Sequence, residues 1–186
     1  MFSLFEHFTK MNQRIWVSLV LTIFFIALDL LTKFIATRIL FSGELVVIIP
    51  HFIDFVLVKN TGISFGWLGH GGNPLGWYGL SLFTLLAILY LLWVIGTNFY
   101  KLSNLSLFCC SLIIGGAVSN AWERMYLSYV TDFIHFHFFS YSFFVNNMAD
   151  NFISLGAFLL ALEYLIKKKK KDAAQQSVLE LFFRSQ

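Results

Sequence analysis

The sequence predicts an all-α polytopic membrane protein with four transmembrane helices, a small extracytoplasmic β-sheet and an aromatic segment at the membrane interface. Composition is the first reason: 58% of the 186 residues are hydrophobic and 12% are charged, whereas soluble domains are about 45–50% apolar and about 25% charged. The second reason is that the charges leave four apolar windows of the length that a spanning helix needs, about 20 residues. The same composition excludes a disordered chain, a disulfide-rich scaffold and a nucleic-acid-binding protein.

The four windows define the transmembrane helices. In the first window Asp29 is the only charge between Arg14 and Lys33, and no charge falls between Lys59 and Lys101. Segments buried in lipid must be helical, because open strands would leave backbone groups unpaired. The sequence therefore predicts one membrane-embedded domain, 1–166. Its helices are expected at about 15–35, 75–97, 103–122 and 147–166.

The distribution of Lys and Arg predicts the orientation, because the cytoplasmic loops of membrane proteins are enriched in these residues. With four spans both termini lie on one side, and nine of the 13 basic residues fall on that side. Those nine are Lys10, Arg14, Lys101, Lys167, Lys168, Lys169, Lys170, Lys171 and Arg184, and the other four are Lys33, Arg38, Lys59 and Arg124. Both termini are therefore predicted to be cytoplasmic. We expect the lysine run to end the last helix and to begin a basic cytoplasmic tail, 167–186, that touches anionic lipid headgroups.

Two segments are predicted to lie outside the membrane. Residues 44–58 are rich in β-branched side chains and are interrupted by Pro50 and His51, a pattern typical of two short strands. Residues 132–146 are rich in aromatic side chains, which gather at the membrane–water interface. We therefore expect 44–58 to form the small sheet and 132–146 to lie along the interface as a loop.

The unusual polar residues gather near the outer membrane face on this topology. They are Asp29, Lys33, Asn60, Asn120, Glu123, Arg124, Asp132, Asn147 and Asp150. Ionisable groups inside a membrane are costly and mark functional sites by default, so this grouping predicts a polar site at the outer interface. Structural explanations stay open for single residues. Asp29 and Lys33 have the spacing of a helix ion pair, Glu123 and Arg124 suit a helix end at the headgroups, and Asp150 suits a helix N-terminus.

Two local patterns resemble a serine-hydrolase motif and a metal-binding histidine pair, but the rest of what these sites require is not evident in the sequence. The segment from Gly62 to Gly66, with Ser64 at its centre, matches the G-x-S-x-G pattern of serine hydrolases, which requires a strand-to-helix elbow and a partner His and acid. His135 and His137 would face the same side of a strand, as metal ligands do, although their aromatic neighbours favour an interfacial pair. No metal site is predicted.

Five motifs, taken in chain order, resemble those of one family. They are Asp29-x-x-Thr32-Lys33, Asn60-x-Gly62-x-Ser64-Phe65-Gly66, Gly115-Gly116-Ala117-x-Ser119-Asn120-x-x-Glu123-Arg124, Val130-Thr131-Asp132-Phe133-Ile134 and Asn147-x-Ala149-Asp150. On these motifs the chain resembles, over about 20–166, the prolipoprotein signal peptidases. These type II signal peptidases are aspartic peptidases of bacterial inner membranes. The second motif also accounts for the serine pattern.

The match has three departures. Ser119 stands where the family usually has Gly, Glu123 where it has Asp, and Asn146 where it has Phe. Glu123 keeps the negative charge but is longer by one methylene. We therefore expect Asn120 or Arg124 to be held differently from the family pattern.

The resemblance implies removal of the signal peptide from diacylglyceryl-modified prolipoproteins, with Asp132 and Asp150 at the catalytic positions of the family. Two facing carboxyl groups share one proton because close like charges oppose double ionisation, and the titration belongs to the pair. One aspartate would then activate water while the other protonates the carbonyl oxygen. The residues expected to bind substrate or support the site are Asp29, Lys33, Asn60, Gly62, Asn120, Glu123, Arg124 and Asn147.

The resemblance also implies that no metal or cofactor is needed. The expected partners are the prolipoprotein and membrane lipids, with the active site near the outer face of the inner membrane, the chain acting as a monomer, and no nucleic acid bound. Two alternatives stay open. One is a membrane protein that transports protons or binds lipid or ions, and transport would require polar residues along a path through both membrane halves, with sites near the midplane. A catalytically inactive relative that acts as a scaffold is left open by the three departures.

Overall fold

The computed structural model describes residues 2–41, 43–61 and 74–184. Four of the described helices are long and apolar enough to cross a membrane, and a four-stranded antiparallel sheet accompanies them, which confirms the predicted class. In chain order the elements are α1 (Phe2–Ile39), β1 (Leu45–Ile49), β2 (Ile53–Asn60), α2 (Pro74–Asn98), the short 3-10 helix η1 (Phe99–Lys101), α3 (Asn104–Leu127), β3 (Val130–Phe138), β4 (Tyr141–Asn146) and α4 (Met148–Arg184).

Three of the long helices extend beyond their predicted bounds. α1 begins at Phe2 rather than near residue 15, and α3 ends at Leu127 rather than near residue 122. α4 continues through the lysine run to Arg184, so the prediction that these lysines end the helix is wrong. Residues 167–177 are exposed, and lysine, alanine and glutamine are good helix formers. Intrinsic propensity, rather than packing, therefore accounts for this part of α4.

The sheet contains two hairpins in the order β1-β2-β3-β4, with every neighbouring pair antiparallel. β1 and β2 form the hairpin predicted for residues 44–58. β3 and β4 form a second hairpin, so the prediction that 132–146 is a loop is wrong, whereas its place at the membrane interface stays a prediction. An isolated hairpin is marginally stable, and the β-branched and aromatic residues of β3 suit a strand, so β3 pairs with the free edge of β2. Asp132 is consequently on a strand, opposite Val58.

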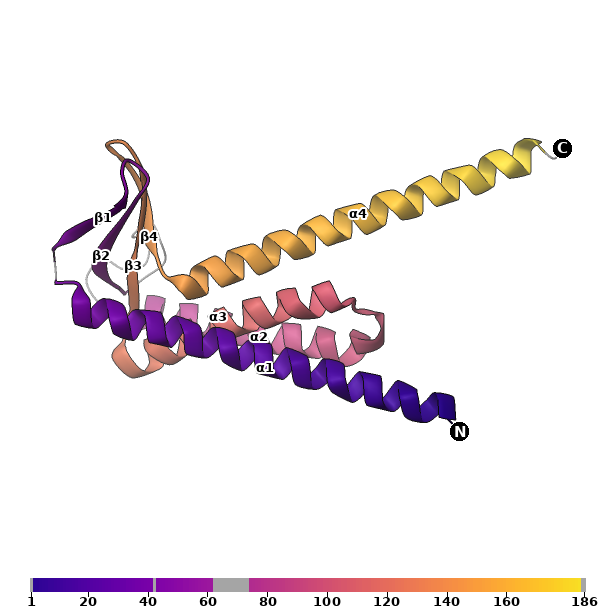
Figure 1. Ribbon diagram of the computed structural model, residues 1–186, viewed down its shortest axis with the longest axis horizontal. Coiled ribbons are helices and arrows are strands. Elements are labelled where there is room, and N and C mark those ends of the chain that lie inside the picture. Colours follow the sequence, from indigo (N-terminus) through magenta and orange to yellow (C-terminus); the bar gives the residue numbers. More distant parts are fainter. Residues whose placement is uncertain (1, 42, 62–73, 185–186) are drawn as a thin grey trace.

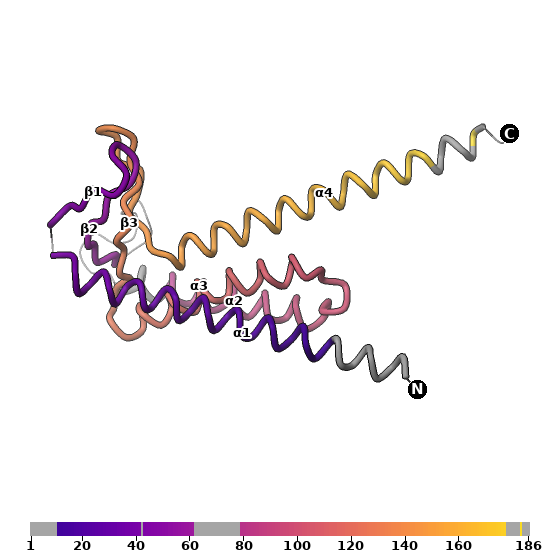
Figure 2. The backbone as a smooth tube through the Cα atoms, viewed as in Figure 1, coloured from indigo at the N-terminus to yellow at the C-terminus, as the bar shows by residue number. Residues whose placement is uncertain are grey.

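The sheet lies at one end of the helices, and the two ends of the described chain lie at the opposite end (Figure 1). The backbone trace shows α4 diverging from α1 as it runs away from the sheet (Figure 2). Two small apolar clusters hold the sheet end together. One contains Ala36, Leu40, Phe133 and Ile134 beneath the sheet, and the other contains Phe25, Leu112 and Phe152 between the helices.

Most of α3 is buried, whereas the apolar windows of α1, α2 and α4 are largely exposed, as expected of helices that face lipid. Two glycines of α3 allow its neighbours to approach closely. A Cβ added at Gly115 would lie 2.8 Å from the Cβ of Phe25 in α1, and one added at Gly116 would lie 2.5 Å from the backbone oxygen of Ala149 in α4. Because larger side chains would push both helices away, these glycines let polar groups of α1, α3 and α4 meet.

Candidate active site

Asp132 lies on β3, and only 1% of its surface is exposed. Its Oδ2 accepts a hydrogen bond from Nδ2 of Asn60 at 2.8 Å, and its Oδ1 accepts one from Nδ2 of Asn147 at 2.7 Å. Asn60 is the last residue of the neighbouring strand β2, and Asn147 immediately precedes α4. Two amides from different elements therefore fix the orientation of this carboxyl group.

Asp150 lies in the first turn of α4, where Asn147 acts as the N-cap. The Oδ1 of Asn147 accepts a hydrogen bond from the backbone N–H of Asp150 at 3.0 Å, which satisfies one of the free donors at a helix start. Because Nδ2 of the same amide reaches Asp132, a single side chain links the two aspartates. On the other side, Oδ1 of Asp150 accepts a hydrogen bond from Nδ2 of Asn120 in α3 at 2.8 Å.

Lys33 in α1 is 2% exposed and organises the polar groups behind the aspartates. Its Nζ lies 2.7 Å from Oδ2 of Asp29 and 3.1 Å from Oε2 of Glu123, and it donates to Oδ1 of Asn120 at 2.7 Å. An ammonium group can only donate hydrogen bonds. Lys33 therefore fixes the oxygen side of the Asn120 amide and leaves its Nδ2 directed at Asp150.

The pair formed by Asp29 and Lys33 has the i,i+4 spacing expected from the sequence, and Asp29 also holds the start of α4. The Oδ1 of Asp29 accepts a hydrogen bond from the backbone N–H of Ala149 at 2.7 Å, a favourable place for a negative charge. Its Oδ2 accepts one from Oγ of Ser119 at 2.6 Å. Ser119, one of the three departures, thus gives Asp29 a donor that glycine lacks.

Glu123, in the last turns of α3, holds the start of β3. Its Oε2 accepts a hydrogen bond from the backbone N–H of Thr131 at 2.9 Å, and its Oε1 accepts one from the Thr131 hydroxyl at 2.6 Å. Since Thr131 immediately precedes Asp132, Glu123 positions the strand that carries this aspartate. The link from Glu123 to Asn120 runs through Lys33.

Thr131 is a supporting residue that sequence reasoning missed. The available signal was its place beside Asp132 within the motif Val130 to Ile134. That position alone does not identify the partner, because the carboxylate that binds Thr131 belongs to a different element. The contact depends on how the end of α3 meets the start of β3.

The remaining residues singled out in the sequence do not all lie at the aspartate pair. Arg124 is half-buried near the end of α3, where its charge acts on Asp150 and Asp132. Gly62 and the rest of the serine pattern lie outside the described residues. Asn146, the third departure, donates from Nδ2 to Oδ1 of Asn151 at 3.1 Å.

His135 and His137 share one face of β3 and approach a single carboxylate on β2. Oδ2 of Asp54 lies 2.9 Å from Nε2 of His137 and 3.8 Å from Nδ1 of His135, and the two rings stack with centroids 5.1 Å apart. Within the described residues, no group of three or more His, Cys, Asp or Glu side chains is arranged to hold a metal ion. The two histidines therefore belong to the polar pairing of the sheet.

The polar cluster contains more acids than bases. Its acids are Asp29, Glu123, Asp132 and Asp150, and its bases are Lys33 and Arg124. Burial, and next the negative charge of Asp150, raise the pKa of Asp132 to about 7, against the opposing effect of the hydrogen bonds from Asn60 and Asn147. A pair of interacting carboxyl groups with one fully buried member is able to hold one proton near neutral pH, so that one carboxyl group accepts a proton while the other donates one.

The fold and this site define a polytopic membrane protein with two linked aspartates, Asp132 buried and Asp150 half-buried, at the end of its helices next to the sheet. A family model described as Signal peptidase (SPase) II matches residues 21–166. The chain therefore belongs to the signal peptidase II family, which confirms the resemblance seen in its motifs. Membership makes it a protease of the bacterial inner membrane.

Curated relatives and solved structures agree with this family. The chain is 37% identical over 167 residues to a lipoprotein signal peptidase of Coxiella burnetii, covering 88% of this chain and 98% of that protein. It is 32% identical to a lipoprotein signal peptidase of Acinetobacter baumannii, covering 87% of this chain and 90% of that protein. A solved bacterial membrane enzyme is similar with a TM-score of 0.73 and 25% identity, over 84% of this chain and 92% of the other.

Proposed function

We propose that the chain is an aspartic endopeptidase that removes the signal peptide from diacylglyceryl-modified prolipoproteins. The observation that carries this proposal is the linked pair of Asp132 and Asp150, joined through the amide of Asn147. Asn60 and Asn120, from two further elements, each donate a hydrogen bond to one carboxyl oxygen of the pair. Family membership over residues 21–166 supports the lipoprotein substrate.

Amide hydrolysis by such a pair needs one proton between the two carboxyl groups. The ionised aspartate takes a proton from water as the water oxygen attacks the carbonyl carbon, and the protonated aspartate gives its proton to the carbonyl oxygen. Collapse of the tetrahedral intermediate then breaks the carbon–nitrogen bond. The leaving amine takes up the proton that the first aspartate took from water, and the former carbonyl oxygen returns its proton to the second aspartate. The raised pKa of Asp132 supports a protonated member at neutral pH, and the titration belongs to the pair.

The supporting residues divide into two groups in this proposal. Asn60, Asn120 and Asn147 donate hydrogen bonds to the aspartates directly and fix the orientation of the two carboxyl groups. Lys33 and Glu123 act through other groups, since Lys33 orients Asn120 and Glu123 fixes Thr131. We propose that Arg124 contributes positive charge beside the substrate, and that the chain acts as a monomer.

Isosteric variants of the aspartates test the assignment. Asp132→Asn and Asp150→Asn are each expected to abolish cleavage of a lipidated prolipoprotein by the purified protein. The double variant is expected to be little worse, because groups that act as a unit are non-additive. Asp54→Asn is the matched control, since Asp54 is also buried on the sheet but pairs with histidines. Substantial cleavage by either single variant would contradict the proposal.

Orientation is the second part of the proposal. We propose that both termini are cytoplasmic and that the aspartates lie near the outer face, because nine of 13 basic residues fall on the side of the termini. In a background where Cys109 and Cys110 are serine, a cysteine at Ser140 should react with an impermeant thiol reagent applied from the periplasm. A cysteine at Gln175 should not react, and both positions are exposed in the structure. The reverse labelling would invert the topology.

Transport stays an alternative that no observation favours. Between Ser111 and Ser119 the buried face of α3 carries only apolar side chains and glycines. A polar path from the aspartates to the other end of the helices is therefore interrupted along the most buried described helix.

A further inference from the structure

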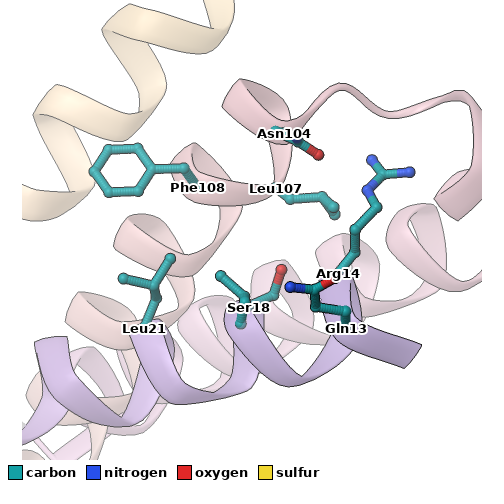
Figure 3. Close-up of a pocket in the computed structure, with 8 residues that line it drawn as sticks. Gln13, Arg14, Ser18, Leu21, Asn104, Leu107 and Phe108 are labelled. Atoms are coloured by element: carbon teal, nitrogen blue, oxygen red, sulfur yellow. The ribbon is translucent and has the colours of Figure 1, made fainter. Parts of the chain in front are cut away.

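A cavity lies between α1 and α3 at the end of the helices farthest from the sheet. It has a volume of about 320 Å³, and its walls include Arg14, Val17 and Leu21 from α1 and Asn104 and Phe108 from α3. Figure 3 shows Arg14 and Leu21 on α1 and Asn104 and Phe108 on α3, on the two sides of this cavity. The proposed peptidase chemistry uses none of these residues.

The cavity is polar at one end and apolar at the other. Arg14 and Asn104 lie toward the terminal end of the helices, whereas Val17, Leu21 and Phe108 follow toward the middle of the membrane-spanning segments. Seven residues separate Arg14 from Leu21, a rise of about 10 Å along a helix. Arg14 also lies fifteen residues before Asp29, about 22 Å along the axis. That span is most of a hydrocarbon core about 30 Å thick, so Arg14 lies toward the membrane face opposite the aspartates.

Arg14 presents a fixed cation at the polar end. Its guanidinium donates a hydrogen bond to the backbone oxygen of Leu102 and lies 5.2 Å from the ring centroid of Phe99. Its Nε has no hydrogen-bond partner among the described residues. The side chain is thus held in place by two contacts, and its buried Nε donor is unpaired within the described part of the chain.

Charges of both signs lie near the same end, where the Glu163 carboxylate offsets Lys167 and the lysine run continues beyond it. Glu163 of α4 accepts hydrogen bonds from Ser103 and Ser106 at the start of α3 and pairs with Lys167 at 2.6 Å. The lysine run therefore begins beside the first turn of α3, close to Asn104. The N-terminus of α3, where Ser103 caps the backbone N–H of Ser106, adds a partial positive charge. An anionic group next to an apolar chain complements this arrangement.

We propose that the cavity binds an anionic phospholipid of the membrane. The phosphate lies at Arg14 and Asn104, and one acyl chain runs along Val17, Leu21 and Phe108. Basic pockets between transmembrane helices on the cytoplasmic side are suited to such headgroups. Only the assignment to the cytoplasmic leaflet rests on the proposed orientation, and binding itself is independent of the proposed peptidase activity.

Native mass spectrometry of the full chain in detergent tests the proposal. The probes are phosphatidylglycerol, which is anionic, and phosphatidylcholine, which is not. The parent should bind phosphatidylglycerol more tightly. Arg14→Gln should weaken that binding about fivefold or more, since one cation at the membrane surface contributes about 1 kcal/mol, or a factor of about five. Arg14→Lys should keep most of the preference for the anionic lipid.

Two matched controls accompany these variants. Arg38→Gln removes an arginine from the opposite end of α1, where the guanidinium also lies over a phenylalanine ring, 5.1 Å from the centroid of Phe34, and it should bind phosphatidylglycerol like the parent. Val17→Trp fills the apolar part of the cavity and should weaken binding of both lipids. Val20→Trp, on an exposed part of α1 outside the cavity, should not.

Several outcomes would overturn the proposal. One is that the parent binds the two lipids equally, and another is that Arg14→Gln and Val17→Trp bind phosphatidylglycerol like the parent. A third is that Arg38→Gln loses as much binding as Arg14→Gln. Displacement of the lipid by millimolar inorganic phosphate would indicate a free-anion site. If Arg14→Gln fails to fold, Arg14→Lys and Val17→Trp decide the result. Asp132→Asn should bind lipid like the parent, so failure of the peptidase proposal and failure of this one are distinguishable.

Discussion

Replacing Glu123 with alanine tests whether this side chain positions the strand that carries Asp132. Glu123 is 7% exposed, and alanine would remove two hydrogen bonds to Thr131 and an ion pair with Lys33. Breaking a buried ion pair by removing one partner costs about 3–5 kcal/mol. Lys33 keeps Asp29 and Asn120 as partners, so we expect the lower end, about 3 kcal/mol. For a chain of this length that corresponds to a fall in Tm of about 6–12 °C.

The same substitution should also slow cleavage at temperatures well below Tm, where the variant is folded. Without Glu123, the backbone N–H of Thr131 loses its acceptor, and the start of β3 is free to shift. A displacement of about 1 Å in a catalytic group costs on the order of 100-fold in rate. Glu123→Asp restores the residue that the family usually has and should keep measurable activity.

The assay measures cleavage of a lipidated prolipoprotein per folded molecule, together with Tm, for the parent and each variant. Glu163→Ala is the matched control, because Glu163 also accepts two hydrogen bonds, here from two hydroxyls, and pairs with a lysine, but at the far end of the helices. It should lower Tm and leave cleavage per folded molecule unchanged. The reasoning is refuted if Glu123→Ala cleaves and melts like the parent, or if Glu163→Ala loses as much activity. An inactive relative would show no cleavage in any of these proteins.

Two further predictions concern the proton on Asp132 and the hydroxyl of Ser119. The folded chain holds the Asp132 proton up to about pH 7, whereas an unfolded aspartate releases it near pH 3.9. The folded state therefore binds more protons between about pH 4 and pH 7, and the free energy of unfolding falls as pH rises through this window. Asp132→Asn should flatten this part of the Tm profile and melt higher than the parent at pH 8, while cleavage by the parent should decline above about pH 7. Ser119→Ala removes the hydrogen bond to Asp29 and should cost about 1.5 kcal/mol with cleavage retained, whereas Ser154→Ala, exposed on α4, should leave Tm unchanged.

Local and compositional features of the chain were predictable from the sequence. The four membrane-spanning helices follow from hydropathy and length, because lipid offers a backbone no partner outside its own helix. The pair of Asp29 and Lys33 follows from i,i+4 spacing on one helix. The first hairpin follows from β-branched residues on both sides of Pro50 and His51. Each of these features depends on residues that are near one another in the chain.

The tertiary structure decided which distant groups pair. Residues 132–146 carry the composition of an interfacial segment, yet they form strands because the free edge of β2 offers backbone partners. Glu123 binds Thr131 rather than its helical neighbours, since the end of α3 meets the start of β3. The amide of Asn147 links Asp132 to Asp150 only because α4 begins where β4 returns beside β3. The donor and acceptor atoms of a side chain determine which hydrogen bonds it is able to make, but packing determines which partners come within reach.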